Sequence, residues 1–186
     1  MIESIPYVLT GIGIIISILY YTSVLQNANK TRELQLKAQE QATETRQAQL
    51  YMQVFQELNS DKRWKEYLDA RYSTEWDNYE DFQEKYGRGN PDFFSKLSSL
   101  FWTYNAIGML IHDGLLDSKK LYGLMGPMAT AQWSKWKEIV WEMRRDLNMP
   151  SAYSGFEYLG SEMKKLEDEG YVDIIVKDLT KTNPNR

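Results

Sequence analysis

An uncharged, apolar N-terminal segment constrains this chain more than any other feature. No charged side chain occurs from Ser4 to Asn29, and residues 5–25 within that window are almost wholly apolar. About 20 apolar residues in a helix span the hydrocarbon core of a bilayer, which is roughly 30 Å thick. The sequence therefore predicts a transmembrane helix over residues 5–25, preceded by a short external N-terminus of residues 1–4.

Two other interpretations fit this segment less well. A cleaved signal peptide begins with a positively charged stretch and ends at a small-residue cleavage site. Here the leader carries no Lys or Arg, and the segment ends in Tyr20–Leu25. A core helix of a soluble protein is disfavoured by the uncharged length and by the Ile-rich residues Ile12–Leu19. We therefore keep the membrane anchor as the prediction.

Cations flank the apolar segment on its C-terminal side only. None precedes it, and four follow it: Lys30, Arg32, Lys37 and Arg46. Cytoplasmic flanks of membrane helices carry the excess of Lys and Arg. The pattern predicts a single-pass protein of the cell membrane, with the N-terminus outside and the C-terminal domain in the cytoplasm.

Small residues share one face of the predicted membrane helix. Thr10, Gly13 and Ser17 are separated by three and four residues, and small residues at such spacing let a second helix approach closely. We predict helix packing there, with the alternative that small residues are simply common in membrane spans.

The next segment, residues 26–49, is predicted to be a helical stalk. No Gly or Pro occurs from Ile14 to Tyr86, and the stalk is rich in good helix formers. A 4-3 pattern that suits a coiled coil runs through Leu34, Ala38, Gln41, Thr45, Ala48, Met52 and Phe55. Because Gln41 and Thr45 lie in the middle of this seam, a solvated or partner-covered stalk is favoured over a self-associating coiled coil.

Residues 50–170 are predicted to form an all-α cytoplasmic domain, a compact helical bundle. Caps, breakers and apolar periodicity predict helices at 61–72, 77–87, 91–112, 117–125, 129–147 and 155–169. Asn90-Pro91 is the clearest start signal, and Gly126-Pro127 is interpreted as a break between two helices. The tail, residues 171–186, includes an apolar stretch at 172–176 that suits a strand or a docking segment.

Composition excludes several classes of function. The chain has 22 basic and 26 acidic residues and a net charge of −4, which disfavours nucleic acid as a partner. It has no cysteine, which excludes disulfides, thiolate catalysis and iron–sulfur clusters.

Few residues suggest chemistry, and we predict no catalytic, cofactor-binding or metal-binding residue. His112, the only histidine, follows an apolar stripe at a helix end, where a structural or capping role is favoured. Glu138 and Glu142 share a helix face, but carboxylate metal sites in bundles also need histidines. An acidic, aromatic cluster is the candidate partner surface, with simple solvation as the alternative: Trp76, Asp77, Tyr79, Glu80 and Asp81.

Several segments resemble those of an uncharacterised family of single-pass membrane proteins, a domain-of-unknown-function group frequent in archaea. They are Met1–Gly11, Arg46–Phe55, Trp102–Gly108, Asp113–Asp117, Trp133–Trp136 and Phe156–Leu159. The likeness covers most of residues 1–170 and does not extend over the tail. It implies an anchor, a stalk and a helical domain, and it implies no reaction. The family's distribution implies a target among archaeal energy-conserving methyltransferase or redox complexes.

These observations predict a non-enzymatic accessory or regulatory subunit. Anchored in the bilayer, its helical domain would bind a larger membrane protein complex and cover part of it, to protect or inhibit. One alternative is a self-associating membrane scaffold or sensor, built as a homo-oligomer through Gly13, Ser17 and the stalk. A second alternative is a membrane-bound enzyme that uses carboxylates.

Overall fold

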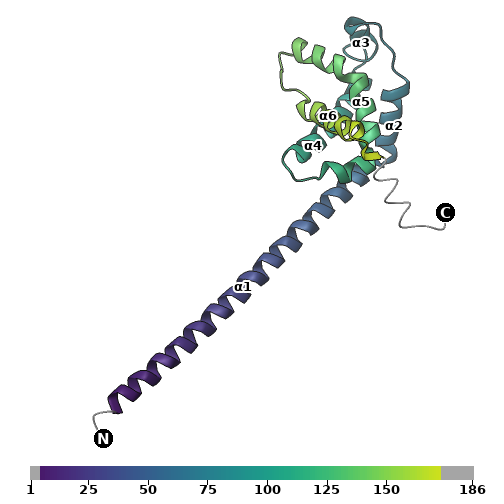
Figure 1. The fold of residues 1–186 in the computed structure, drawn as a ribbon. Coiled ribbons are helices and arrows are strands. Elements are labelled where there is room, and N and C mark those ends of the chain that lie inside the picture. The colour runs from purple at the N-terminus through teal and green to yellow at the C-terminus, as the bar shows by residue number, and fades with distance from the viewer. Residues whose placement is uncertain (1–4, 173–186) are drawn as a thin grey trace, which may run out of the picture. The chain divides into compact units, whose positions relative to one another are not determined.

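The protein is all-helical in this computed structural model, which describes the backbone of residues 5–172 and the side chains of residues 13–172. Its described residues form six helices and no strand (Figure 1). The helices are α1 (Ile5–Leu58), α2 (Asp61–Tyr72), α3 (Tyr79–Lys85), α4 (Pro91–His112), α5 (Ser118–Asp146) and α6 (Ser154–Asp168). The chain divides into two compact units, residues 1–48 and 49–186. The prediction of an all-α fold is confirmed.

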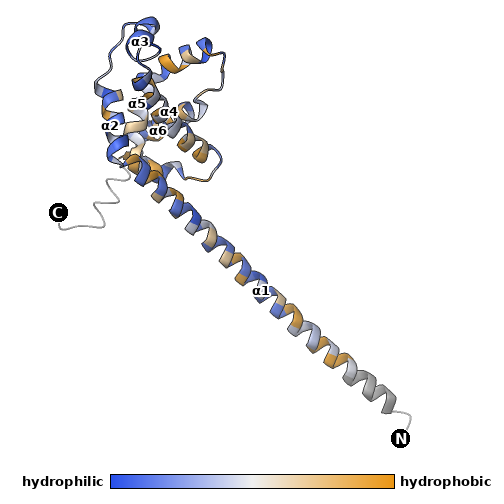
Figure 2. Cartoon of the chain, turned by 180° about the vertical axis from the view of Figure 1, so that it is seen from behind, coloured by the Kyte–Doolittle hydropathy of each residue, from blue (hydrophilic) through white to orange (hydrophobic). Residues whose placement is uncertain are grey.

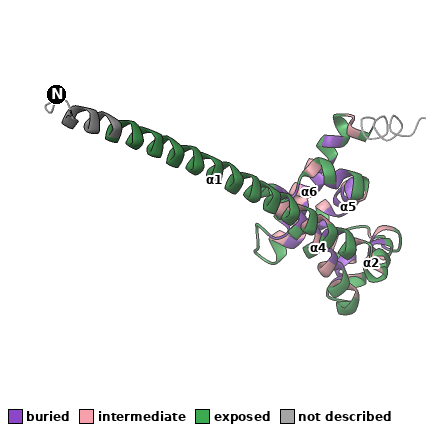
Figure 3. Ribbon diagram, turned by 90° about the horizontal axis from the view of Figure 1, so that it is seen from below, coloured by how far each residue is buried: buried purple, intermediate pink, exposed green. Residues whose placement is uncertain are grey.

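The N-terminal unit is a single stretch of α1 that changes character along its length. Apolar residues give way to polar ones after Leu25 (Figure 2). Every side chain from Gly13 to Arg46 is exposed (Figure 3). The predicted helical conformation of residues 26–49 is confirmed, since α1 runs through all of them.

The predicted transmembrane span is not found in the described part of the chain. No helix whose side chains are described is both long and apolar enough to cross a bilayer.

The helical unit is built around contacts of α6 with α4 and α5. Its core is strongly aromatic, and the largest fully buried side chains are those of Trp136, Tyr104, Phe82, Phe101 and Phe156. Phe101 and Trp136 meet edge to face with ring centroids 5.4 Å apart, a preferred geometry for aromatic pairs. The last turns of α1 join this core through Val54, which is buried.

Local capping explains where several helices begin. Ser60 accepts a hydrogen bond from the Arg63 N–H at the start of α2. Asn90 accepts one from Phe93, with Pro91 at the first helical position of α4. These caps satisfy N–H groups that have no partner inside the helix. The predicted starts of both helices are confirmed.

Helix α5 corrects the predicted break at Gly126-Pro127. Pro127 lies inside one continuous helix, so the two separate helices predicted for 117–125 and 129–147 are wrong. A proline cannot bond the carbonyl four residues earlier, here that of Gly123, but both residues are exposed and water can satisfy that carbonyl. Tyr122, Met125 and Ala129 continue one buried stripe across the proline. Their burial outweighs its cost of about 3 kcal/mol.

The short acidic helix also differs from its prediction. α3 begins at Tyr79, capped by Asn78, whose side chain accepts a bond from the Asp81 N–H. The helix was predicted over 77–87, whereas Thr74 before it is buried and donates to the Ala70 carbonyl. The predicted apolar tail segment at 172–176 lies almost wholly outside the described residues.

Candidate functional site

The small-residue face on α1 is open in the described part of the chain. A Cβ placed on Gly13 would meet nothing within 4 Å. The Ser17 hydroxyl donates to the Gly13 carbonyl at 2.8 Å, which uses its proton within the helix. Thr10 belongs to α1, but its side chain lies outside the described residues. The face at Gly13 and Ser17 therefore has room for a neighbour, and no described residue of the N-terminal unit fills it.

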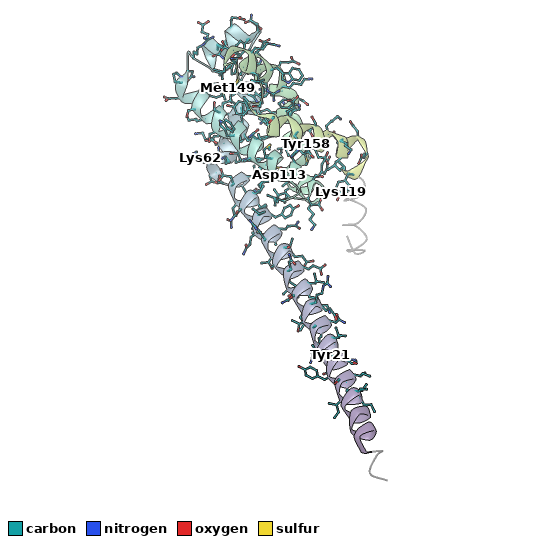
Figure 4. All side chains as sticks on the ribbon, turned by 90° about the vertical axis from the view of Figure 1, so that its left-hand side faces the viewer. Tyr21, Lys62, Asp113, Lys119, Met149 and Tyr158 are labelled. Atoms are coloured by element: carbon teal, nitrogen blue, oxygen red, sulfur yellow. The ribbon has the colours of Figure 1, made fainter. Side chains whose placement is uncertain are left out.

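Large apolar side chains surround α1 next to this face. Nine of them between Ile14 and Leu25 are 44–66% exposed. Tyr21, one of the nine, extends away from the helix (Figure 4). A helix that is apolar on all sides is normally buried in protein or in lipid. This segment of the N-terminal unit therefore lacks the covering that its composition requires.

The acidic, aromatic cluster is divided by the fold. Trp76 stacks on the buried Trp136 with ring centroids 4.6 Å apart, so it belongs to the edge of the core. Tyr79 is half-buried, donates to Asp146 at 3.1 Å and accepts from Gln83 at 2.7 Å. Their inward packing leaves the exterior of the cluster to carboxylates.

The carboxylates of this cluster differ in their availability. Asp81 accepts hydrogen bonds from Lys85 at 2.8 Å and from the Asp77 N–H at 3.0 Å, and these two bonds lower the pKa of its carboxyl. Asp77 and Glu80 are exposed. The candidate partner surface thus reduces to Asp77 and Glu80, while Asp81 stabilises its own turn.

The remaining candidates for chemistry have structural partners. His112 is exposed, lies 3.0 Å from Asp113 and packs edge to face on Tyr158. Glu142 pairs with Arg145, so it forms no shared site with Glu138. The described residues contain no group of three or more His, Asp or Glu that could hold a metal ion.

The fold brings together polar residues that the sequence did not single out. Arg63 lies between two carboxylates, with Nε 2.6 Å from Glu57 and Nη1 2.7 Å from Glu66, and it also donates to Ser99 at 3.0 Å. Glu66 is only 7% exposed. Beside this network, a cleft of about 360 Å³ opens between α2 and α4.

Lys135 was likewise missed. Its ammonium donates to the carbonyls of Arg71 and Thr74, at 2.7 and 2.9 Å, and so caps the C-terminal end of α2. It also lies over the rings of Trp76 and Trp136, at 5.4 and 5.5 Å. Burial, with a smaller contribution from the nearby Arg71, lowers its pKa. A lysine three residues after Gln132 in a helix gives no sequence signal of such a role.

Residues of the segments on which the family resemblance rests lie where helices meet. The Asn105 side chain accepts a hydrogen bond from the Gly155 N–H at 2.8 Å, at the start of α6. Gly108 approaches Gly155 so closely that a Cβ would come within 1.8 Å of the Gly155 carbonyl oxygen. These contacts fix the approach of α4 to α6.

A second such contact ties α1 to the turn before α5. The Tyr51 hydroxyl accepts from the Asp117 N–H at 2.6 Å and donates to the Asp117 carbonyl at 2.8 Å. Asp117 itself caps α5 through its side chain, which accepts from Lys119 and Lys120. These residues, from segments on which the family resemblance rests, therefore serve packing and capping.

A comparison with protein families places this chain. A domain of unknown function, DUF4760, matches residues 7–163. The chain belongs to the DUF4760 family. The DUF4760 match extends from the apolar part of α1 through the first turns of α6, so the family includes residues of both compact units. No curated protein and no solved structure is significantly similar to the chain.

Proposed function

We propose that this DUF4760 protein is a non-catalytic, membrane-anchored accessory or regulatory subunit. The apolar segment 5–25 inserts in the bilayer as a single span. The helical unit binds a larger membrane protein complex and covers part of its surface. The observation that carries the proposal is the exposed apolar segment of α1.

The energetics favour lipid around this segment. Full burial of an Ile or Leu side chain is worth about 1.5–3 kcal/mol. Nine large apolar side chains between Ile14 and Leu25 remain exposed, so their removal from water would stabilise the chain by on the order of 10 kcal/mol. The segment N-terminal to Gly13 is apolar in sequence and extends the run to the length that a bilayer needs.

The flanking charges support one orientation. Lys30, Arg32 and Lys37 follow the apolar segment, and no cation precedes it. The excess of Lys and Arg on one flank favours that side as cytoplasmic. The helical unit would then lie in the cytoplasm and the N-terminus outside.

The proposed role of the helical unit is binding rather than catalysis. Its polar side chains serve mainly to hold helices together, as Lys135 caps α2 and Asn105 caps α6. Asp77 and Glu80 remain exposed and offer a small acidic surface to a partner. An anchor that confines the unit to the membrane raises its effective concentration near a membrane target, so each single contact can be weak.

A matched pair of variants tests the anchor. Ile14→Lys with Ile18→Lys places two cations in the apolar segment, whereas Leu34→Lys with Leu36→Lys adds the same charge at equally exposed positions of the polar stretch. Each lysine near the centre of a span costs about 2.5–3.5 kcal/mol. We expect the first variant to leave the membrane fraction after alkaline carbonate extraction and the second to stay. Equal behaviour of the two variants would refute the anchor.

A pull-down from native membranes tests the partner. The full-length chain, tagged at its C-terminus and extracted in mild detergent, should bring a stoichiometric membrane complex that mass spectrometry identifies. The variant Asp77→Lys with Glu80→Lys should recover less of it, while Glu138→Lys, an exposed position elsewhere in the unit, should not. Recovery of this chain alone, at a size above a monomer, would instead favour the self-associating scaffold, which the open face at Gly13 supports.

A further inference from the structure

The cleft between α2 and α4 has a lining of unusual composition for an acidic protein. Three lysines, two carboxylates and two serines surround a volume of about 360 Å³. Ligand sites for small molecules begin at about 300 Å³. The cleft is therefore large enough for a small metabolite.

One side of the cleft is fixed by buried charges. Arg63 holds Glu66 at 2.7 Å and Ser99 at 3.0 Å, and Glu66 is almost fully buried. The Arg63 guanidinium also pairs with Glu57 at 2.6 Å, so it compensates the Glu66 charge in part and reduces the repulsion of Glu66 toward an anion. A hydrogen-bonded and buried network of this kind holds the lining in one arrangement.

The positive charges of the lysines in the cleft have no such close ion-pair partner. Lys65 and Lys96 have no carboxylate within 4 Å in the described part of the chain, and the nearest to Lys62 is Glu66 at 4.0 Å. Lys62 also lies in the first turn of α2, where the helix dipole disfavours a cation. An anion in the cleft would offset both unfavourable arrangements. Ser95, on α4 beside Lys96, offers a hydroxyl donor to the same anion.

Asp69 restricts the chemistry of the ligand further. Its carboxylate lines the same cleft and has no cation within 4 Å among the described residues. The Asp69 carboxylate would repel an anion without hydroxyl groups, whereas it could accept a hydrogen bond from a hydroxyl of the ligand. The lysine ammonium groups and the serine hydroxyls of the cleft can donate to phosphate oxygens.

We propose that this cleft binds a phosphate ester that also carries hydroxyl groups. The phosphate lies among Lys65, Lys96 and Ser95, and a hydroxyl of the ligand donates to Asp69. The site goes beyond the proposed accessory role and does not depend on membrane attachment. A soluble sugar or glycerol phosphate and the headgroup of a phosphatidylglycerol lipid share this chemistry.

The test is an NMR titration of the full-length chain in phosphatidylcholine nanodiscs at constant ionic strength. Glycerol 3-phosphate and inorganic phosphate are the probes, and backbone amide shifts are the readout. We expect saturable shifts at residues 62–69 and 95–99, with tighter binding of glycerol 3-phosphate. The same shifts on transfer to phosphatidylglycerol nanodiscs, without added ester, would identify a lipid headgroup as the source.

Charge-matched variants make the test specific. Lys65→Gln with Lys96→Gln should weaken binding at least about tenfold, while Lys119→Gln with Lys120→Gln should leave it unchanged. Lys62, in the cleft, and Lys119 lie on different parts of the helical unit (Figure 4). All four lysines of the variants are exposed, so the substitutions should leave the fold intact.

A third variant tests the role of Asp69. Asp69→Asn should tighten the binding of inorganic phosphate and reduce the preference for glycerol 3-phosphate. Three results would overturn the proposal: the absence of saturable shifts in the cleft, equal weakening by both pairs of lysine variants, and an unchanged preference in Asp69→Asn.

Discussion

Replacing Gly108 with alanine tests the helix contact on which the helical unit depends. On an unhindered helix, alanine in place of glycine stabilises by about 1 kcal/mol. At Gly108 the new Cβ would lie 1.8 Å from the Gly155 carbonyl oxygen and 2.5 Å from its carbonyl carbon. The neighbour is backbone, so no side-chain rotation can relieve the overlap. A fall in the free energy of unfolding therefore indicates that the close contact exists, and a rise indicates that it does not.

The structure sets the size of the expected effect. Ordinary contacts of a Cβ lie beyond about 3.4 Å, so α4 and α6 would have to separate by more than 1 Å at this crossing. Overpacking of a well-packed core typically costs 1–3 kcal/mol. We take about 3 kcal/mol for a clash with backbone and subtract about 1 kcal/mol for helix propensity. The free energy of unfolding should fall by about 2 kcal/mol.

Urea unfolding followed by tryptophan fluorescence isolates this effect. All six tryptophans lie between Trp64 and Trp141, within the helical unit, so the signal does not include the N-terminal unit. With a denaturant slope of about 2 kcal/mol per molar urea, the midpoint should fall by about 1 M. Ala106→Gly, at an exposed position of the same helix, calibrates the propensity term and should lower stability by about 1 kcal/mol.

One result would refute this reasoning directly. If Gly108→Ala raises the urea midpoint by the amount that Ala106→Gly lowers it, helix propensity alone governs both positions. The close approach of Gly108 to Gly155 would then be wrong, and with it the crossing of α4 and α6.

Three further substitutions test other contacts by the same assay. Asn105→Ala removes the side chain that caps α6, whose own N-cap residue Tyr153 supplies no side-chain hydrogen bond. This substitution should lower the free energy of unfolding by about 1 kcal/mol, whereas Asn105→Asp, which keeps an acceptor, should retain most of the stability. Arg63→Met leaves the buried Glu66 carboxylate uncompensated and should cost about 3–5 kcal/mol, whereas adding Glu66→Met should recover most of the loss. Burial raises the pKa of Tyr104, so its neutral form stabilises the fold below the unfolded pKa of about 10, and this stability is lost as the pH rises above it. The urea midpoint of Tyr104→Phe should therefore fall less between pH 9 and pH 11 than that of the unsubstituted chain.

Signals that act over a few residues allowed much of the fold to be predicted. Ser60 and Asn90 cap their helices through N–H groups three residues away, and the sequence shows both partners together. The buried stripe of α5, with Trp133, Trp136 and Met143, follows from helical periodicity in the same way. The proline rule failed because it weighs one lost hydrogen bond and ignores the tertiary burial on either side of Pro127.

Contacts between distant residues could not be predicted in this way. Asn105 and Gly155 are 50 residues apart, and Arg63 and Ser99 are 36 apart. No spacing in the sequence predicts such pairs, because they depend on how the helices cross. The inward packing of Trp76 could not be predicted for the same reason, since only the fold brings Trp76 onto Trp136.

Residues of the segments on which the family resemblance rests act mainly inward. Asn105 and Gly108 set a helix crossing, and Asp117 caps α5 and holds Tyr51. A chain with this fold would need these residues whatever it binds. Trp102 differs, because it is 51% exposed although it rests against Tyr153. Exposed tryptophans are enriched among residues that dominate binding energy. Recognition is therefore to be sought on outward-facing features that the fold itself does not require.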